Sequence, residues 1–194
     1  MGLLVMILGL ILFLGVHTLT TQRDLRARFI VSMGEGGYKI FYALVSIAGL
    51  ALITWGFAEY RATGWIDVWN PPKAFKHITV ALMLPAVILV VASYLRGRIY
   101  TTLKHPMLTG VKLWAAAHLL ANGDLGSIIL FGSFLAWAVF DRISLKRRPD
   151  AGAPPIPVGG PGNDLIAIAV GIVAYLALAF AFHPVVIGVP VFGV

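Results

Sequence analysis

The sequence predicts an all-α protein, a polytopic bundle of transmembrane helices that forms a single membrane domain over residues 1–194. Hydrophobic residues make up 59% of the chain, and the mean hydropathy is +0.91. Charged residues make up only 12%, about half of the ~25% usual in soluble domains. A soluble fold could not use this much apolar surface without aggregating, so lipid must be the solvent. No period-two alternation of strand length is present, which argues against a closed β-barrel.

Apolar runs long enough to cross a bilayer occur six times. A membrane-spanning helix needs about 20 mostly apolar residues to cross ~30 Å of hydrocarbon. The predicted spans cover residues 2–19, 38–60, 77–95, 106–122, 125–140 and 165–182. The fourth span contains Lys112 and His118, so we expect it to face other helices rather than lipid.

The basic residues predict the orientation of these spans. Most follow the first, third and fifth spans: Arg23, Arg26, Arg28, Lys39, Arg96, Arg98, Lys104, Arg142, Lys146, Arg147 and Arg148. The connections on the other side hold only Arg61, Lys73 and Lys76. Because basic loops stay in the cytoplasm, six spans with both termini on the outer, periplasmic side are predicted. Omitting the fourth span would place the last basic block on the wrong side.

Two connections are rich in Gly or Pro. Gly34, Gly36 and Gly37 flank Glu35 and predict a flexible cytoplasmic turn before the second span. Residues 149–162 are predicted to form a flexible linker to the last helix.

Composition excludes several classes of function. The chain has no Cys, which rules out disulfides, thiolate metal sites, a cysteine nucleophile and covalent c-type haem. The net charge of +7 comes from short blocks between apolar runs, so a nucleic-acid partner is not expected. The carboxylates near spans all lie at span ends, which leaves neither a paired-carboxylate site nor a proton relay within the bilayer. No nucleophile elbow or phosphate-binding Gly loop is present.

The five histidines are the remaining candidates for a functional site. They are His17, His77, His105, His118 and His183. His77 and His183 fall at the outer ends of spans and are predicted to be interfacial. His105 precedes Pro106 and is expected to cap the fourth span at headgroup level. Ordinary helix geometry places His17 about 22 Å from the outer end of its span and His118 about 18 Å from the inner end of its own. Both therefore lie within the hydrocarbon.

Two neutral imidazoles on different helices are the usual ligand set of a non-covalent b-type haem. Hydrogen bonds that join helices are the alternative explanation. On the fourth span, residues Trp114, Ala115, His118 and Asn122 share one face, and Ala115 keeps the helix wall thin. Cations at the cytoplasmic edge could pair with haem propionates; the candidates are Arg23, Arg28 and Lys104. His105 is the alternative metal ligand.

The segment HPMLTGVKLWAAAHLLANGD, residues 105–124, resembles the signature of the NnrU family of bacterial inner-membrane proteins. The first span and its exit, VHTLTTQRDLRARF, are similar to that family too. The resemblance implies a multi-pass protein of the bacterial cytoplasmic membrane. It also implies a redox or small-ligand role linked to denitrification, in particular to nitrite and nitric oxide metabolism.

The family resembles the zeta-carotene isomerase of plants and cyanobacteria, which uses a b-type haem. By motif, its axial histidines fall on His17 and His118. The isomerase carries a cysteine three residues before the second histidine, where this chain has Ala115, so ligand exchange by sulfur is impossible here. A haem-dependent polyene isomerase is one alternative function, and an iron that releases one histidine could bind a small apolar or gaseous ligand.

A second alternative comes from Lys104, His105, Pro106 and Gly110. This pattern resembles the Arg-His-Pro-x-x-x-Gly helix start of small membrane methyltransferases that use S-adenosylmethionine. Those enzymes add a paired acidic motif after the next helix, whereas the chain offers Asp141 followed by basic residues. The methyltransferase motif is therefore incomplete.

Overall fold

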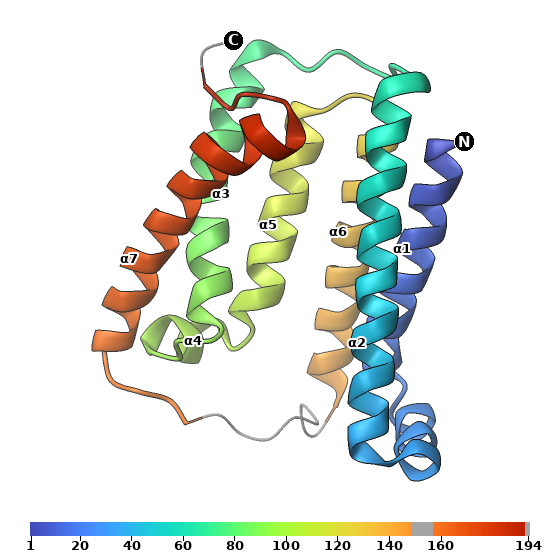
Figure 1. Ribbon diagram of the computed structural model, residues 1–194. Coiled ribbons are helices and arrows are strands. Elements are labelled where there is room, and N and C mark those ends of the chain that lie inside the picture. Colours follow the sequence, from blue (N-terminus) through green and yellow to red (C-terminus); the bar gives the residue numbers. More distant parts are fainter. Residues whose placement is uncertain (149–156, 193–194) are drawn as a thin grey trace. The chain divides into compact units, whose positions relative to one another are not determined.

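All the named secondary-structure elements among the residues that the structure describes are helical. The computed structural model describes residues 1–148 and 157–192, and the elements form in the order α1 to α7 (Figure 1). They are α1 (Gly2–Thr18), the 3-10 turn η1 (Leu19–Thr21), α2 (Arg23–Thr63), α3 (Lys73–Ala92), α4 (Arg98–Leu103), α5 (Pro106–Ala121), α6 (Leu125–Arg147), α7 (Gly162–Ala177) and the π-helix η2 (Leu178–Ile187). The predicted all-α class is confirmed.

Five helical segments of the described chain are long and apolar enough to cross a membrane. They are Gly2–Thr21, Arg23–Thr63, Lys73–Ala92, Leu125–Arg147 and Gly162–Ile187. The protein is therefore a multi-pass membrane protein by length and composition. Helix α5 has 16 residues and measures about 24 Å at ~1.5 Å per residue, which is short of the bilayer core. The sixth span and the orientation of the termini stay predictions.

Part of the predicted linker lies outside the described residues, namely 149–156. Residues 157–160 have no regular structure, and α7 begins at Gly162.

Contacts divide the chain into two compact units. Unit 1 consists of Met1–Asn70 and Asn122–Pro149, so it contains α1, η1, α2 and α6. Unit 2 consists of Pro71–Ala121 and Asp150–Val194, so it contains α3, α4, α5, α7 and η2. His17 belongs to the first unit, and His118 belongs to the second.

Glycines let α1 and α2 of unit 1 approach closely. A Cβ atom at Gly9 would collide with the backbone of Ile53, and one at Gly56 would collide with the backbone of Met6. Small residues at such contacts allow the dispersion packing that holds membrane helices together, because lipid removes the hydrophobic force between them. This packing fixes the helix that carries His17.

Helix α2 contains one sharp break at Gly34. This residue has φ 72° and ψ 164°, a conformation that favours glycine because a Cβ atom would clash. Gly36 and Gly37 are helical, so the predicted turn over these three glycines is confined to the first of them. Lys39 and Glu35 pair across the first turn after the break at 2.7 Å.

The loop between α2 and α3 is tied to the start of α6 within unit 1. Backbone N–H groups of Val68 and Trp69 donate to the Gly123 carbonyl at 2.9 and 3.0 Å. The Asp124 carboxylate accepts from the Ser127 N–H at 2.8 Å and so caps α6 by supplying a partner for an otherwise unpaired helix donor.

Unit 2 is held by polar contacts as well as by packing. The Thr79 hydroxyl of α3 donates to the Ala117 carbonyl of α5 at 2.6 Å. The Tyr175 hydroxyl of α7 donates to the Val80 carbonyl at 3.2 Å. Asp164 at the start of α7 accepts from the backbone N–H groups of Arg98 and Ile99. These bonds position the three long helices around His118.

Candidate functional site

His17 lies in the last turn of α1, and its ring is oriented by its own helix. The Nδ1 atom is 2.6 Å from the Phe13 carbonyl oxygen, one turn earlier. A carbonyl can only accept, so Nδ1 carries the proton and donates it. In the neutral ring the lone pair then lies on Nε2. That is the tautomer in which imidazole can bind a metal through Nε2.

Aromatic rings from three helices of unit 1 surround His17. The Phe13 ring of α1 stacks on it with centroids 4.1 Å apart, and the Tyr42 ring of α2 lies at 5.1 Å. The Trp137 ring of α6 meets it edge-on at 5.8 Å. The Trp137 Nε1 is buried and has no hydrogen-bond partner among the described residues. Buried donors are normally satisfied, so this N–H could donate to an acceptor beside His17.

His118 is oriented in the same way in unit 2. Its Nδ1 is 2.9 Å from the Trp114 carbonyl oxygen, again one turn earlier on the same helix. The lone pair of the neutral ring therefore lies on Nε2 here as well. The Trp114 ring lies against the imidazole with centroids 5.5 Å apart.

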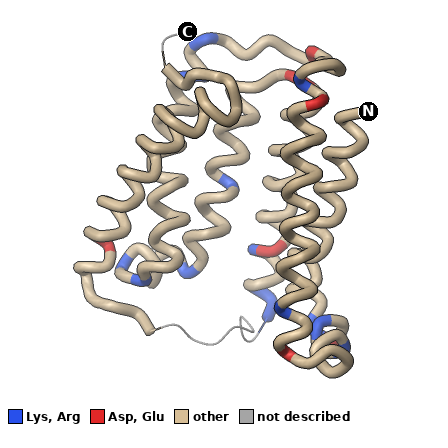
Figure 2. Tube along the Cα trace, in the orientation of Figure 1, with Lys and Arg blue, Asp and Glu red and all other residues tan. Residues whose placement is uncertain are grey.

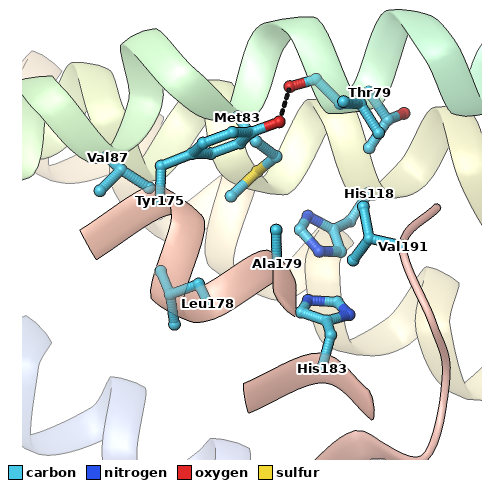
Figure 3. Close-up of a pocket in the computed structure, with 10 residues that line it drawn as sticks. Thr79, Met83, Val87, His118, Tyr175, Leu178, Ala179, His183 and Val191 are labelled. Carbon is cyan, nitrogen blue, oxygen red and sulfur yellow. Dashed lines mark hydrogen bonds between the residues drawn. The ribbon is translucent and has the colours of Figure 1, made fainter. Parts of the chain in front are cut away.

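The imidazole of His118 lines a largely apolar cavity of about 70 Å³. The walls come from α3, α7 and η2, and they include Met83, Leu178 and Ala179 (Figure 3). The ring of His183 faces that of His118 across this cavity, with centroids 6.2 Å apart (Figure 3).

The interfacial position expected for His183 stays a prediction, and the structure places its ring against that of His118. Tyr175, Ala179 and His183 all line the cavity, and their four-residue spacing puts them on one helical face. That spacing was the available signal. It could not identify the partner, because His118 is distant in the sequence.

The other predicted site residues lie in several places. In unit 1, Arg23 and Arg28 are exposed on the short part of α2 before the break. In unit 2, Ala115 is fully buried, and Lys104 ends α4 with φ 61°. Asn122 follows the end of α5 and belongs to unit 1 by its contacts.

His105 lies immediately before α5. Its carbonyl accepts from the backbone N–H and the hydroxyl of Thr109, both at 3.2 Å, in keeping with the predicted place at the start of this helix. The structure thus brings together Trp114 and His118 and adds His183 to them.

No group of three or more His, Asp or Glu side chains that could hold a metal ion occurs within the residues described. Haem has a smaller requirement, because the porphyrin supplies four nitrogens and the protein adds only axial ligands. His17 and His118 each carry the lone pair of the neutral ring on Nε2, the nitrogen that such a ligand would use.

The fold and these residues define a multi-pass helical membrane protein with two histidines whose rings are oriented by their own helices. The sequence matches the NnrU protein family over residues 5–191. The chain therefore belongs to the NnrU family, as the resemblance of residues 105–124 implied. Comparison with curated proteins and with solved structures gave no match.

Proposed function

We propose that this NnrU protein binds one b-type haem through His17 and His118 and acts in the bacterial cytoplasmic membrane. Its role would be redox or small-ligand chemistry associated with nitrite and nitric oxide metabolism, which membership of the family suggests. The observation that carries the proposal is the shared arrangement of the two histidines. Each donates Nδ1–H to a carbonyl one turn back, so in the neutral ring Nε2 is the nitrogen whose lone pair iron would use.

The surroundings of both histidines fit such a cofactor. Aromatic rings surround His17, and the walls of the cavity beside His118 are largely apolar, which supports a site for a hydrophobic cofactor. The buried Trp137 N–H beside His17 offers a donor to an acceptor on the cofactor. When bound, haem would supply an iron that changes oxidation state and accepts a small ligand.

The proposal names His17 and His118 as the residues that would hold the iron. If both residues hold the iron, loss of either one should weaken binding of the same haem. The propionates would pair with exposed cations, for which Arg23, Arg28 and Lys104 stay the candidates. Trp114 orients His118 through its carbonyl, while Ala115 and Asn122 stay candidates for the helix face beside the ring.

A visible absorption spectrum tests the proposal directly. Protein purified in detergent from haem-replete cells is expected to show a Soret band and a sharp reduced α-band, with about one haem per chain by pyridine haemochrome assay. His17→Ala and His118→Ala should each lose the six-coordinate spectrum. His77→Ala is the matched control, because this imidazole is exposed at the start of α3. A colourless protein that takes up no added hemin would refute the proposal.

Two activities stay as alternatives, and each has its own measurement. A polyene isomerase should change the isomer ratio of a cis carotenoid in cells that express the chain. A methyltransferase should bind S-adenosylmethionine by calorimetry and lose that binding in His105→Ala. We expect neither result for a haem protein of this family.

A further inference from the structure

A second cavity lies at one end of unit 1, where η1 and the end of α6 meet. It has a volume of about 250 Å³, and its polar walls include Gln22, Ser144, Arg147 and Arg148. Figure 2 shows that basic residues gather at this end of the unit. Drug-sized ligands occupy pockets of roughly 300–1,000 Å³, so this volume suits a small charged group rather than a whole large ligand.

The Arg148 guanidinium lines this cavity and is held in place by hydrogen bonds. Its side chain is only 12% exposed, and Nη2 donates to the Asp141 carboxylate at 3.1 Å. Nη1 donates to the Thr20 carbonyl at 3.1 Å. The Nε atom is buried and has no acceptor within the part of the chain that the structure describes. A guanidinium carries five N–H donors, so the fixed group retains a donor for an oxyanion.

The charges around the cavity favour an anionic occupant. Arg147 and Arg148 line it, together with the Gln22 amide and the Ser144 hydroxyl, which are neutral donors. Asp141 lies beside it and is engaged by Arg148. Guanidinium groups bind phosphate oxygens with charge-assisted hydrogen bonds and with matching geometry.

One wall of the cavity is apolar and continues outward. Phe140 and Ile143 line it on α6, and they are 47% and 44% exposed. These side chains lie in the last part of the candidate membrane-spanning helix α6, whereas the arginines lie at its end. A ligand with a charged head and a hydrocarbon tail would satisfy both parts, because its tail could lie along the apolar side chains.

We infer that this cavity binds the phosphodiester headgroup of an anionic membrane phospholipid. The Arg147 and Arg148 guanidinium groups contact the phosphate, and the acyl chain packs on Phe140 and Ile143. The site differs from the histidine site in residues and in ligand chemistry. Basic residues near a membrane generally attract anionic lipids. The inference is more specific, because it requires lipid binding to depend on the residues that line the cavity.

Native mass spectrometry of the full chain in detergent, titrated with phosphatidylglycerol, tests the inference. The wild type should bind phosphatidylglycerol and should bind phosphatidylcholine with the same acyl chains far more weakly. Arg147→Gln should weaken phosphatidylglycerol binding about tenfold, as expected for the loss of a charge-assisted contact. Arg147 is exposed, so this variant should fold. Arg148→Gln should also weaken binding, but it loses the bonds to Thr20 and Asp141 as well.

Lys146→Gln is the matched control, because it removes the same charge from an exposed neighbour that does not line the cavity. It should alter lipid binding by less than about twofold. Equal losses in Lys146→Gln and Arg147→Gln would show diffuse attraction only and would overturn the inference. Phosphatidylcholine binding as tightly as phosphatidylglycerol would do the same. Displacement of the lipid by glycerol phosphate at similar concentration would identify a soluble phosphate as the ligand instead.

Discussion

The imidazoles of His118 and His183 face one another in unit 2, with ring centroids 6.2 Å apart and ring planes inclined by 31°. The first ring donates Nδ1–H to the Trp114 carbonyl. The second ring comes from η2, near the end of the described chain. Two imidazoles beside one largely apolar cavity are unusual, because each polar ring costs free energy in surroundings that lack water. We therefore expect the His183 ring to have a role of its own beside this cavity.

His183→Ala tests what that use is. If His17 and His118 are the axial ligands, the variant should keep about one haem per chain and a six-coordinate spectrum, because no ligand is removed. The enlarged cavity should instead change the binding of carbon monoxide to the reduced protein. Haem content and carbon monoxide titration are the measurements, with His118→Ala as the reference. Loss of haem as complete as in that reference would make His183 an axial ligand.

Trp137→Phe separates folding from cofactor binding. It keeps an aromatic ring next to His17 but removes a buried N–H that has no acceptor among the described residues. The free energy of unfolding of the haem-free protein should change by less than about 0.5 kcal/mol, since no hydrogen bond is lost. Hemin affinity should fall, because the N–H is proposed to donate to the cofactor. Unchanged hemin affinity would contradict that role.

Thr79→Val removes a buried hydrogen bond from the core of unit 2. Thr79 is 8% exposed, and its hydroxyl donates to the Ala117 carbonyl on another helix at 2.6 Å. Hydrogen bonds between membrane helices contribute about 0.6 kcal/mol on average and about 1.7 at most. The variant should therefore lower the Tm in detergent slightly but measurably.

Thr54→Val is the control for this effect. The Thr54 hydroxyl also bonds to a carbonyl, that of Leu50 at 2.9 Å, but within one exposed helix face. Its loss should leave the Tm nearly unchanged. If both variants lower the Tm equally, the hydrogen bond between α3 and α5 adds no stability beyond that of a bond within one helix.

The helical class could be predicted because lipid offers no partner for backbone N–H and C=O groups, so apolar runs must satisfy them internally as helices. The start of α1 and the end of α5 fell close to their predicted places for this reason. The turn at Gly34 was located, but its extent was not, since Gly36 and Gly37 tolerate helix once one residue has absorbed the change of direction. The division into two units had no signal in hydropathy, because it depends on which helices touch.

In the candidate site, too, local features could be predicted from the sequence and long-range contacts could not. The tautomers of His17 and His118 follow from bonds to carbonyls four residues back, and helix geometry makes such bonds available from sequence alone. The contact of His118 with His183 joins positions 65 residues apart, and the sequence contained no pattern that linked them. The cap that Asp164 provides for α4 spans a similar separation. Contacts of this kind are set by packing rather than by local periodicity.

Gly56→Ala tests the close contact between α1 and α2 that supports His17. A Cβ atom at this position would collide with the backbone of Met6 on the neighbouring helix, so the helices must separate. Overpacking of this kind typically costs about 1–3 kcal/mol, and the Tm in detergent should fall accordingly. Gly132→Ala on α6 is the matched control, since a Cβ atom there meets nothing within 4 Å. Alanine forms helix better than glycine, so the control should be neutral or slightly stabilising. A tolerated Gly56→Ala would mean that α1 and α2 pack less closely than described.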